Sequence, residues 1–223
     1  MLLRKTHYFL QNDGIRVRIR RFSDFSLYIE KMVNLNDIFA EFPVLETERL
    51  RLRMVCSGDV TAVFEILGDE QVTRYYGLEP YTSIDQAVER IHVYQQNFRK
   101  RRAIRWGITF KDDDWLLGTV GIMNWKPRFF NAALGYDLAR RYWRQGIMFE
   151  ALTAVLQYAF TTMQMNRLEA FVMPQNKPSS QLLEKLGFQN EGLMREYGYW
   201  GGGFHDLALY SFLKGDWQMR AHP

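Results

Sequence analysis

The stretch ARRYWRQGIM, residues 139–148, contains residue types that could bind a phosphate group. Three arginines precede Gly146, and an apolar run with helical spacing begins directly after it. The first amides of a helix have no acceptor within the helix and carry a partial positive charge, so such a turn can hold an anion. The amides concerned are those of Gln145, Gly146, Ile147 and Met148, and the arginines are Arg140, Arg141 and Arg144. An ordinary strand-to-helix turn explains the stretch equally well, and the chain has no Walker phosphate-loop motif.

Hydrophobic periodicity predicts the elements that would position this turn. Apolar residues every fourth position, starting at Ile147, predict the main core helix over 147–160. Further helices are expected after a capping Ser57 or Asp59, over 83–101 and over 176–186. Strands are expected at 16–22, 45–55, 103–110, 115–125, 131–139 and 167–173, followed by an antiparallel pair linked by residues 200–204. Residues 23–32 read as one or two helical turns, and the whole order predicts an α+β domain built on a mixed sheet.

Composition narrows the class of protein. The chain has 223 residues, of which 47% are hydrophobic, enough for one sizeable core. No apolar stretch approaches the length of a membrane span and no signal peptide is recognisable, so a cytoplasmic protein without membrane contact is expected. The single cysteine, Cys56, excludes an internal disulfide and argues against a metal site, and we interpret it as a packing residue at the end of a strand. The net charge of +4 suits acidic partners without choosing among them.

Three stretches together resemble a known family. They are LGYDLARRYWRQGIMFEAL, RLEAFVMPQNKPSSQLLEKLGF and the closing HDLALYSFLKGDW. The combination is similar to the GCN5-related N-acetyltransferase (GNAT) family, and particularly to its ribosomal-protein-alanine N-acetyltransferase branch, over residues 45–217. The resemblance implies an acyl-CoA N-acyltransferase fold: a mostly antiparallel twisted sheet flanked by helices, with a splay between two central parallel strands. Residues 1–44 would then form an N-terminal extension and 218–223 a C-terminal tail.

The resemblance also implies a binding mode for acetyl-CoA, with no metal. The turn from Trp143 to Met148 would bind the pyrophosphate through backbone amides, with help from Arg141 and Arg144. Main-chain groups of Leu138 and Ala139 would bond the pantetheine arm, which fits the splay like an added strand. Asn176 and Ser179 would contact the cofactor near its pantetheine and sulfur, although both could equally cap the following helix. The family usually has Gly or Ala where Met148 stands, so the Met148 side chain must turn away from the ligand.

Acetyl transfer from a thioester to an amine needs a neutral amine and a proton donor for the thiolate. By the resemblance, the Ser179 hydroxyl could protonate the thiolate. Glu196 is the best candidate for a base, although the closest register places Gly198 where related enzymes have a carboxylate, and Glu196 could equally be a solvent-facing strand residue. Because an α-amino group has a pKa near 8, a weak base acting through water would suffice. Weaker candidates are Tyr136, Tyr197 and Tyr199 as proton donors and His205 as a base; Glu150 lies where a carboxylate also favours the helix dipole.

The leading hypothesis is therefore an acetyl-CoA-dependent N-acetyltransferase that acetylates a protein N-terminal amine, with the N-terminal alanine of a ribosomal protein as the acceptor and direct attack in a ternary complex. A GNAT enzyme acting on a small amine such as a polyamine, an amino acid or an aminoglycoside is the alternative. A non-catalytic acyl-CoA-binding module is the third. Ribosome association through the basic N-terminal strand and either a monomer or a homodimer stay open.

Overall fold

The computed structural model describes residues 8–12, 15–19 and 35–221. An antiparallel hairpin of β1 (Tyr8–Asn12) and β2 (Ile15–Ile19) is the first described element. The predicted strand at 16–22 is thus confirmed over residues 16–19. Residues 20–22 and the helical turns predicted at 23–32 lie outside the described residues.

The main sheet has eight strands among the described residues, in the order β3-β4-β5-β6-β7-β8-β10-β9. Their bounds are β3 Leu45–Glu46, β4 Leu50–Met54, β5 Ile104–Phe110, β6 Asp113–Lys126, β7 Asn131–Leu138, β8 Arg167–Val172, β9 Gln189–Trp200 and β10 Gly203–Leu213. In this described sheet the β7–β8 pair is parallel and every other neighbouring pair is antiparallel. The mixed, mostly antiparallel sheet is confirmed.

The two parallel strands separate soon after they meet. Their ladder pairs residues 131–133 of β7 with residues 167–169 of β8. Beyond these pairs β7 remains bonded to β6 as far as Leu138, and β8 remains bonded to β10 as far as Val172. The C-terminal halves of β7 and β8 therefore diverge, which confirms the predicted splay.

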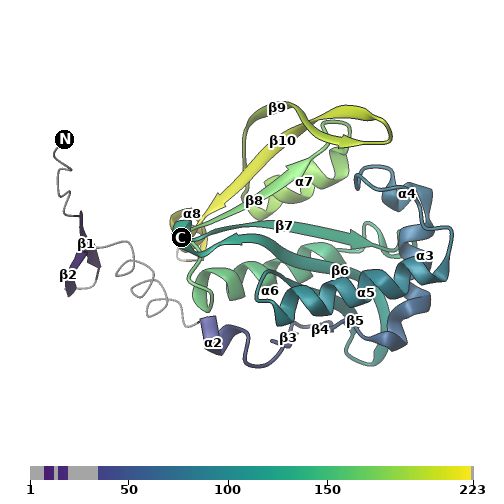
Figure 1. The fold of residues 1–223 in the computed structure, drawn as a ribbon, viewed down its shortest axis with the longest axis horizontal. Coiled ribbons are helices and arrows are strands. Elements are labelled where there is room, and N and C mark those ends of the chain that lie inside the picture. The colour runs from purple at the N-terminus through teal and green to yellow at the C-terminus, as the bar shows by residue number, and fades with distance from the viewer. Residues whose placement is uncertain (1–7, 13–14, 20–34, 222–223) are drawn as a thin grey trace, which may run out of the picture.

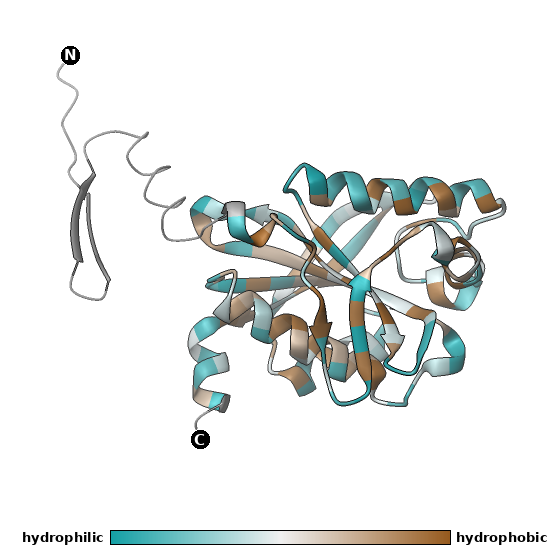
Figure 2. Ribbon diagram, turned by 90° about the horizontal axis from the view of Figure 1, so that it is seen from below, coloured by the Kyte–Doolittle hydropathy of each residue, from teal (hydrophilic) through white to brown (hydrophobic). Residues whose placement is uncertain are grey.

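Helices cover both faces of the sheet (Figure 1). They are α2 Leu35–Ile38, α3 Val60–Gly68, α4 Glu70–Thr73, α5 Ile84–Arg99, α6 Ile147–Thr161, α7 Lys177–Leu186 and α8 Lys214–Ala221. Leu116 and Leu117, successive residues of β6, point to opposite faces. Leu117 lies in the main core with α6, whereas Leu116 lies in a smaller cluster with α3 and α5. Figure 2 shows apolar residues along the central strands, and both apolar and polar residues along each helix, as expected for amphipathic helices around one sheet.

The predicted strand at 45–55 is wrong as a single element. The chain reverses at residues 47–49, so that β3 pairs antiparallel with β4. The Thr47 N–H donates to the Leu50 carbonyl at 3.0 Å, and the Leu50 N–H donates to the Thr47 hydroxyl at 2.9 Å. The Leu and Arg alternation begins only at Arg49, within the reversal, and Glu-Thr-Glu before it contains no Gly, Pro, Asn or Asp to mark a turn, which is why the sequence pattern did not reveal it.

The first predicted helix begins after Asp59, one of the two predicted capping residues, but the Asp59 side chain makes no capping hydrogen bond to it. Ser57 and Asp59 lie in a short 3-10 turn, and neither side chain caps α3. The buried Asp59 carboxylate accepts hydrogen bonds from Arg53 and from the Cys56 N–H. Cys56 itself is exposed and therefore does not pack in the core as expected. Ser83, by contrast, caps α5 by accepting from the Asp85 N–H at 3.1 Å.

Segments at both ends of the domain contribute to its packing. Ile38 and Phe39 lie in the main core, and the Pro43 carbonyl accepts a hydrogen bond from the Trp106 indole at 2.6 Å. Trp217 of α8, an element that the sequence did not predict, packs against the same core. The contacts of Ile38, Phe39 and Pro43 extend the packed unit to residues before 45, whereas Trp217 lies within the predicted bounds; the division into extension, domain and tail stays a prediction.

Candidate functional site

The turn before α6 has a backbone suited to receiving an anion. Arg144 and Gly146 both adopt left-handed conformations, with φ of 60° and 77°. Gly146 is the residue that precedes the helix, and no side chain of the described residues caps this helix end. The first amides of α6 have no acceptor within the helix. The uncapped end therefore presents donors and the positive end of a helix dipole in one place.

The first side chains of α6 point into the core and leave this end clear. Ile147 and Met148 are buried at 1% and 7% exposure and belong to the main hydrophobic cluster. The Met148 side chain is thus turned away from the turn, as the sequence required. Met148 is larger than the Gly or Ala that the family usually has here, but its buried side chain adds no bulk to the backbone surface of the turn.

Two of the predicted arginines contact carboxylates rather than projecting freely. Arg140 pairs with Asp69 at 3.3 Å, and Arg141 pairs with Glu65 at 3.9 Å. Both guanidinium groups are more than half exposed, so these pairs are weak. A cavity of about 340 Å³ lies here, lined by the two arginines, Ala139 and residues of α3 and α4. An anionic ligand beside the turn could therefore recruit either arginine at low cost.

Arg49 was not predicted as a site residue, but it contacts the same turn from the β3–β4 reversal. Its Nε donates to Glu150 at 2.7 Å, and both terminal nitrogens reach the Gln145 carbonyl at 3.3 Å. Burial alone would raise the pKa of Glu150, but hydrogen bonds from Thr47 and Arg49 outweigh it and hold that pKa below its ordinary value. Glu150 therefore anchors the turn instead of facing a ligand. In the sequence, the one available signal for this role was that Thr47 and Arg49 lie two positions apart just before β4.

The main-chain groups of Leu138 and Ala139 are partly occupied. The Leu138 carbonyl accepts from the Trp143 indole at 2.7 Å. The Ala139 N–H donates to the Leu117 carbonyl, and the Ala139 carbonyl accepts from the Tyr142 N–H, both at 2.9 Å. Each carbonyl has a second lone pair, but the Ala139 N–H is not available to a ligand.

The start of α7 brings two hydroxyl groups together across the splay. Asn176 caps the helix by accepting from the Ser179 N–H at 3.3 Å, so the capping interpretation is confirmed. The Ser179 hydroxyl lies 2.7 Å from the Tyr136 hydroxyl of β7. Burial raises the pKa of Tyr136 to about 12, partly offset by its bond to Ser179, and keeps this phenol protonated.

Glu196, the predicted base, lies apart from this pair. Its side chain is exposed, and its left-handed backbone, with φ of 52°, forms a bulge in β9. The Glu196 N–H donates to Asp206 at 2.8 Å. Gly198, the alternative register, is covered by the Trp200 ring, which would come within 2.0 Å of an added Cβ. Within the described residues no hydrogen bond or ion pair links Glu196 to Ser179, and an indole occupies the space where a carboxylate was expected.

The remaining acid–base candidates have structural roles. The His205 ring stacks on Trp200 at 4.2 Å, and its Nε2 lies 3.1 Å from the Trp200 carbonyl. Tyr197 stacks on Phe171, and Tyr199 is 65% exposed on the hairpin. These side chains shape the β9–β10 hairpin and do not join the Tyr136–Ser179 pair.

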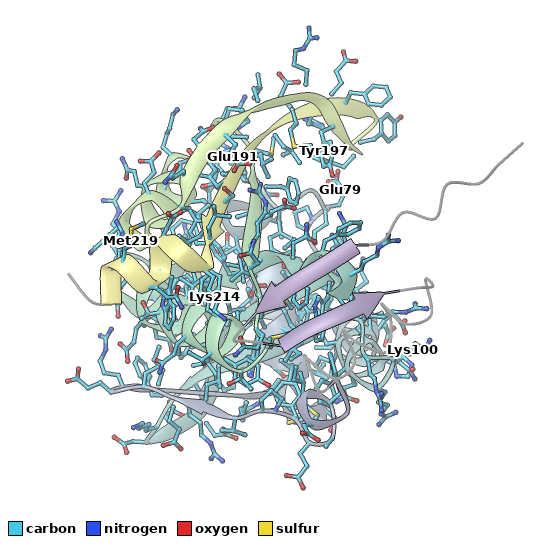
Figure 3. The ribbon with its side chains drawn as sticks, turned by 90° about the vertical axis from the view of Figure 1, so that its left-hand side faces the viewer. Glu79, Lys100, Glu191, Tyr197, Lys214 and Met219 are labelled. Atoms are coloured by element: carbon cyan, nitrogen blue, oxygen red, sulfur yellow. The ribbon has the colours of Figure 1, made fainter. Side chains whose placement is uncertain are left out.

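A second cavity, of about 390 Å³, separates this hairpin from the α4 segment. Trp200 forms one side, and α4 with the following loop, including Gly77 and Glu79, forms the other. An added Cβ on Gly77 would lie 3.4 Å from the Trp200 ring, so loop and hairpin are in contact at one point. Figure 1 shows the hairpin reaching toward α4, and Figure 3 shows Tyr197 and Glu79 in this region.

Across the described residues no three His, Cys, Asp or Glu side chains are grouped to hold a metal ion. The helices within that part of the chain include none that is long and apolar enough to cross a membrane.

Comparisons with known proteins agree with this geometry. Residues 49–189 match the acetyltransferase (GNAT) domain family. An uncharacterized N-acetyltransferase, YoaA of Bacillus subtilis, is 39% identical over 78% of this chain and 98% of its own length. The ribosomal protein uS5 alanine N-acetyltransferase of Escherichia coli is 29% identical over 78% of this chain and 92% of its own.

Among solved structures, Mycobacterium smegmatis RimJ in complex with a CoA disulfide shares the fold, with a TM-score of 0.68 and 24% identity over 77% of this chain and 86% of that one. The divergent parallel strands, the uncapped helix turn and these matches lead to one conclusion: the chain is an N-acetyltransferase of the GNAT family.

Proposed function

We propose that this enzyme transfers the acetyl group of acetyl-CoA to the N-terminal amine of a protein, with the N-terminal alanine of a ribosomal protein as its acceptor. The observation that carries the proposal is the combination of the uncapped α6 turn, the divergent and mutually unpaired C-terminal halves of β7 and β8, and the Ser179 hydroxyl that bonds Tyr136 of β7. The similarity to the uS5 alanine N-acetyltransferase over most of both chains supports the choice of acceptor.

The donor would bind along three successive features. The first amides of α6, around Gly146, would hold its pyrophosphate, and Arg141 and Arg144 would add charge from the rim. The unpaired edges of β7 and β8 would bond the pantetheine arm as an inserted strand. The Asn176 carboxamide would retain its NH₂ group for the same arm while its oxygen caps α7.

Ser179 would stabilise the leaving sulfur. A phenol is a stronger hydrogen-bond donor than an aliphatic hydroxyl, so the Tyr136 proton points to the Ser179 oxygen in the favoured arrangement. The Ser179 proton is then free to be donated to a developing thiolate. The amine nitrogen attacks the thioester carbon, the carbon–sulfur bond breaks, and the surplus amine proton passes to water, from which Ser179 regains the proton that it gives to the thiolate.

The acceptor would enter from the cavity between Trp200 and the loop after α4. No carboxylate occupies the Gly198 position, where the Trp200 ring lies instead. A substrate with an α-amino group needs little help from a base because its pKa is near 8, against about 10.4 for a lysine side chain. This favours a protein N-terminus over a lysine-like amine and leaves the exposed Glu196 to act only through water.

Calorimetric titration of acetyl-CoA, followed by thiol release with two acceptors, tests the proposal. The acceptors are an alanine-starting peptide and spermidine. Binding with release on adding the peptide supports the proposed function. Release with spermidine alone would replace it by the small-amine enzyme. Binding without release from either acceptor would contradict the assigned acceptor, and absence of binding would remove the donor site.

A further inference from the structure

Arg49 lies in the β3–β4 reversal but forms hydrogen bonds with the turn before α6, residues 143–148, and with the first turn of that helix. Its Nε and its backbone N–H both donate to the Glu150 carboxylate, at 2.7 and 2.9 Å. Its two terminal nitrogens reach the Gln145 carbonyl. One residue thus contacts both the last carbonyl before Gly146 and the acidic residue in the first turn of α6.

We infer that Arg49 is a positioning residue for the donor: it orients the Gln145–Gly146 peptide so that its N–H faces the phosphate group, and it neutralises Glu150 beside the same site. The inference rests on the proposed function, because it concerns the turn to which acetyl-CoA is assigned. Arg49 itself is not required to touch the ligand.

The orientation follows from peptide geometry. In a trans peptide the C=O and the following N–H point in opposite directions. Because the Gln145 carbonyl points to the Arg49 guanidinium, the Gly146 N–H points away from it. An added Cβ on Gly146 would lie 3.5 Å from Arg49 Nη2, so the guanidinium packs along the glycine and restrains the turn from that side.

The second effect is electrostatic. Glu150 lies in the first turn of α6, close to the amides assigned to the pyrophosphate, and only 19% of its side chain is exposed. An unpaired carboxylate there would repel a phosphate group in a medium that screens charge less than bulk water does. The bond to Arg49 converts this carboxylate into half of a neutral pair. Thr47 also donates to Glu150, which fixes the carboxylate further.

The two effects can be separated with variants at two positions. Arg49→Gln removes orientation and neutralisation together, whereas Arg49→Gln combined with Glu150→Gln removes orientation alone. Arg49→Lys keeps the positive charge but lacks the fork that bonds Glu150 and Gln145 simultaneously. Arg51→Gln is the matched control, since Arg51 is an exposed arginine on the adjacent strand.

Calorimetry with CoA measures affinity, and rates with S-acetylpantetheine, which has no pyrophosphate, provide a second readout. Arg49→Gln should weaken CoA binding roughly ten-fold, because it removes charged hydrogen bonds that hold the turn, and the partial exposure of Arg49 limits their contribution. The double variant should bind CoA more tightly than Arg49→Gln, and Arg49→Lys should lie between wild type and Arg49→Gln. The rate of acetyl transfer from S-acetylpantetheine should change less than two-fold in every variant.

Wild-type affinity in Arg49→Gln, or equal loss in the control, would overturn the inference while leaving the proposed function intact. Equal affinities for Arg49→Gln and the double variant would refute the neutralising role. A comparable loss with S-acetylpantetheine would show a general structural defect instead. If Arg49→Gln does not fold, the CoA affinities of Arg49→Lys and Glu150→Gln are compared with that of the wild type instead. Failure of the wild type to bind CoA would refute the proposed function itself.

Discussion

Replacement of Arg105 by methionine should destabilise the enzyme strongly, because this arginine is the centre of a buried polar network. Its exposed fraction is 5%, and its Nη2 donates to Asp137 and to the Tyr76 hydroxyl, both at 2.6 Å. Nε donates to Thr119 at 2.8 Å, and Nη1 donates to the Gly135 carbonyl at 2.9 Å. The network joins β5, β6 and β7, so it supports the strand that carries Tyr136.

The magnitude follows from the charge that would be left behind. Asp137 is only 6% exposed, and without Arg105 the hydrogen bonds that its carboxylate would keep within the described part of the chain come from Thr119 and Tyr76. Removing one partner of a buried ion pair costs about 3–5 kcal/mol. For a domain of this size each kcal/mol lowers the melting temperature by about 2–4 °C, so the loss should be roughly 6–20 °C.

Urea unfolding followed by tryptophan fluorescence measures this loss. A companion variant, Arg105→Met with Asp137→Asn, removes the stranded charge while keeping an acceptor for Thr119, and it should be more stable than Arg105→Met alone. Arg51→Gln, on the exposed part of β4, should change stability by less than about 0.5 kcal/mol. A cost below about 1 kcal/mol for Arg105→Met, or no recovery in the double variant, would show that removing Arg105 does not leave an uncompensated buried charge at Asp137.

Three further predictions concern the turn, the hydroxyl pair and an ion pair. Ser179→Ala should lower kcat by roughly 10- to 100-fold, the value of a hydrogen bond to a charged group, with little change in the Kd for acetyl-CoA; unchanged turnover would remove Ser179 from the reaction. Gly146→Val should weaken acetyl-CoA binding measured by calorimetry, because a left-handed conformation costs a side chain about 1–2 kcal/mol and valine more; an unaltered Kd would count against the pyrophosphate assignment. Hydrogen bonds from Arg167 and Ser211 lower the pKa of Glu191 to about 2, whereas unfolded glutamate has a pKa of about 4.3. The folded state therefore holds fewer protons in this window, and the stability from Glu191 is present above pH 4.3 and lost as the pH falls toward 2. Urea melts of Glu191→Gln should show a flatter decline than wild type over that range, and identical curves would contradict the assignment.

The sequence predicted elements wherever the pattern was long and local. The α6 helix repeats its apolar residues every fourth position over four turns, and the β5 to β8 strands are bounded by polar turns. Short elements were missed because they lack a period: α4 has four residues, and β3 has two. Their positions depend on contacts with distant parts of the chain.

The site was predicted where a backbone feature determined it and missed where distant side chains meet. Gly146 directly before an apolar helix was readable as a turn. Arg49 and Glu150, however, are 101 positions apart, and Arg105 resembles any exposed strand arginine until its partner at 137 is known. The bulge at Glu196 and the ring of Trp200 over Gly198 likewise follow from the register of β9 with β10, which no local pattern specifies.

A competition measured by mass spectrometry tests acetyl transfer to a protein N-terminus most directly. The enzyme is mixed with limiting acetyl-CoA, an alanine-starting peptide that also contains a lysine, and an equal concentration of spermidine. We expect the acetyl group on the peptide's α-amine. Acetyl groups found mainly on spermidine or on the lysine side chain would contradict it.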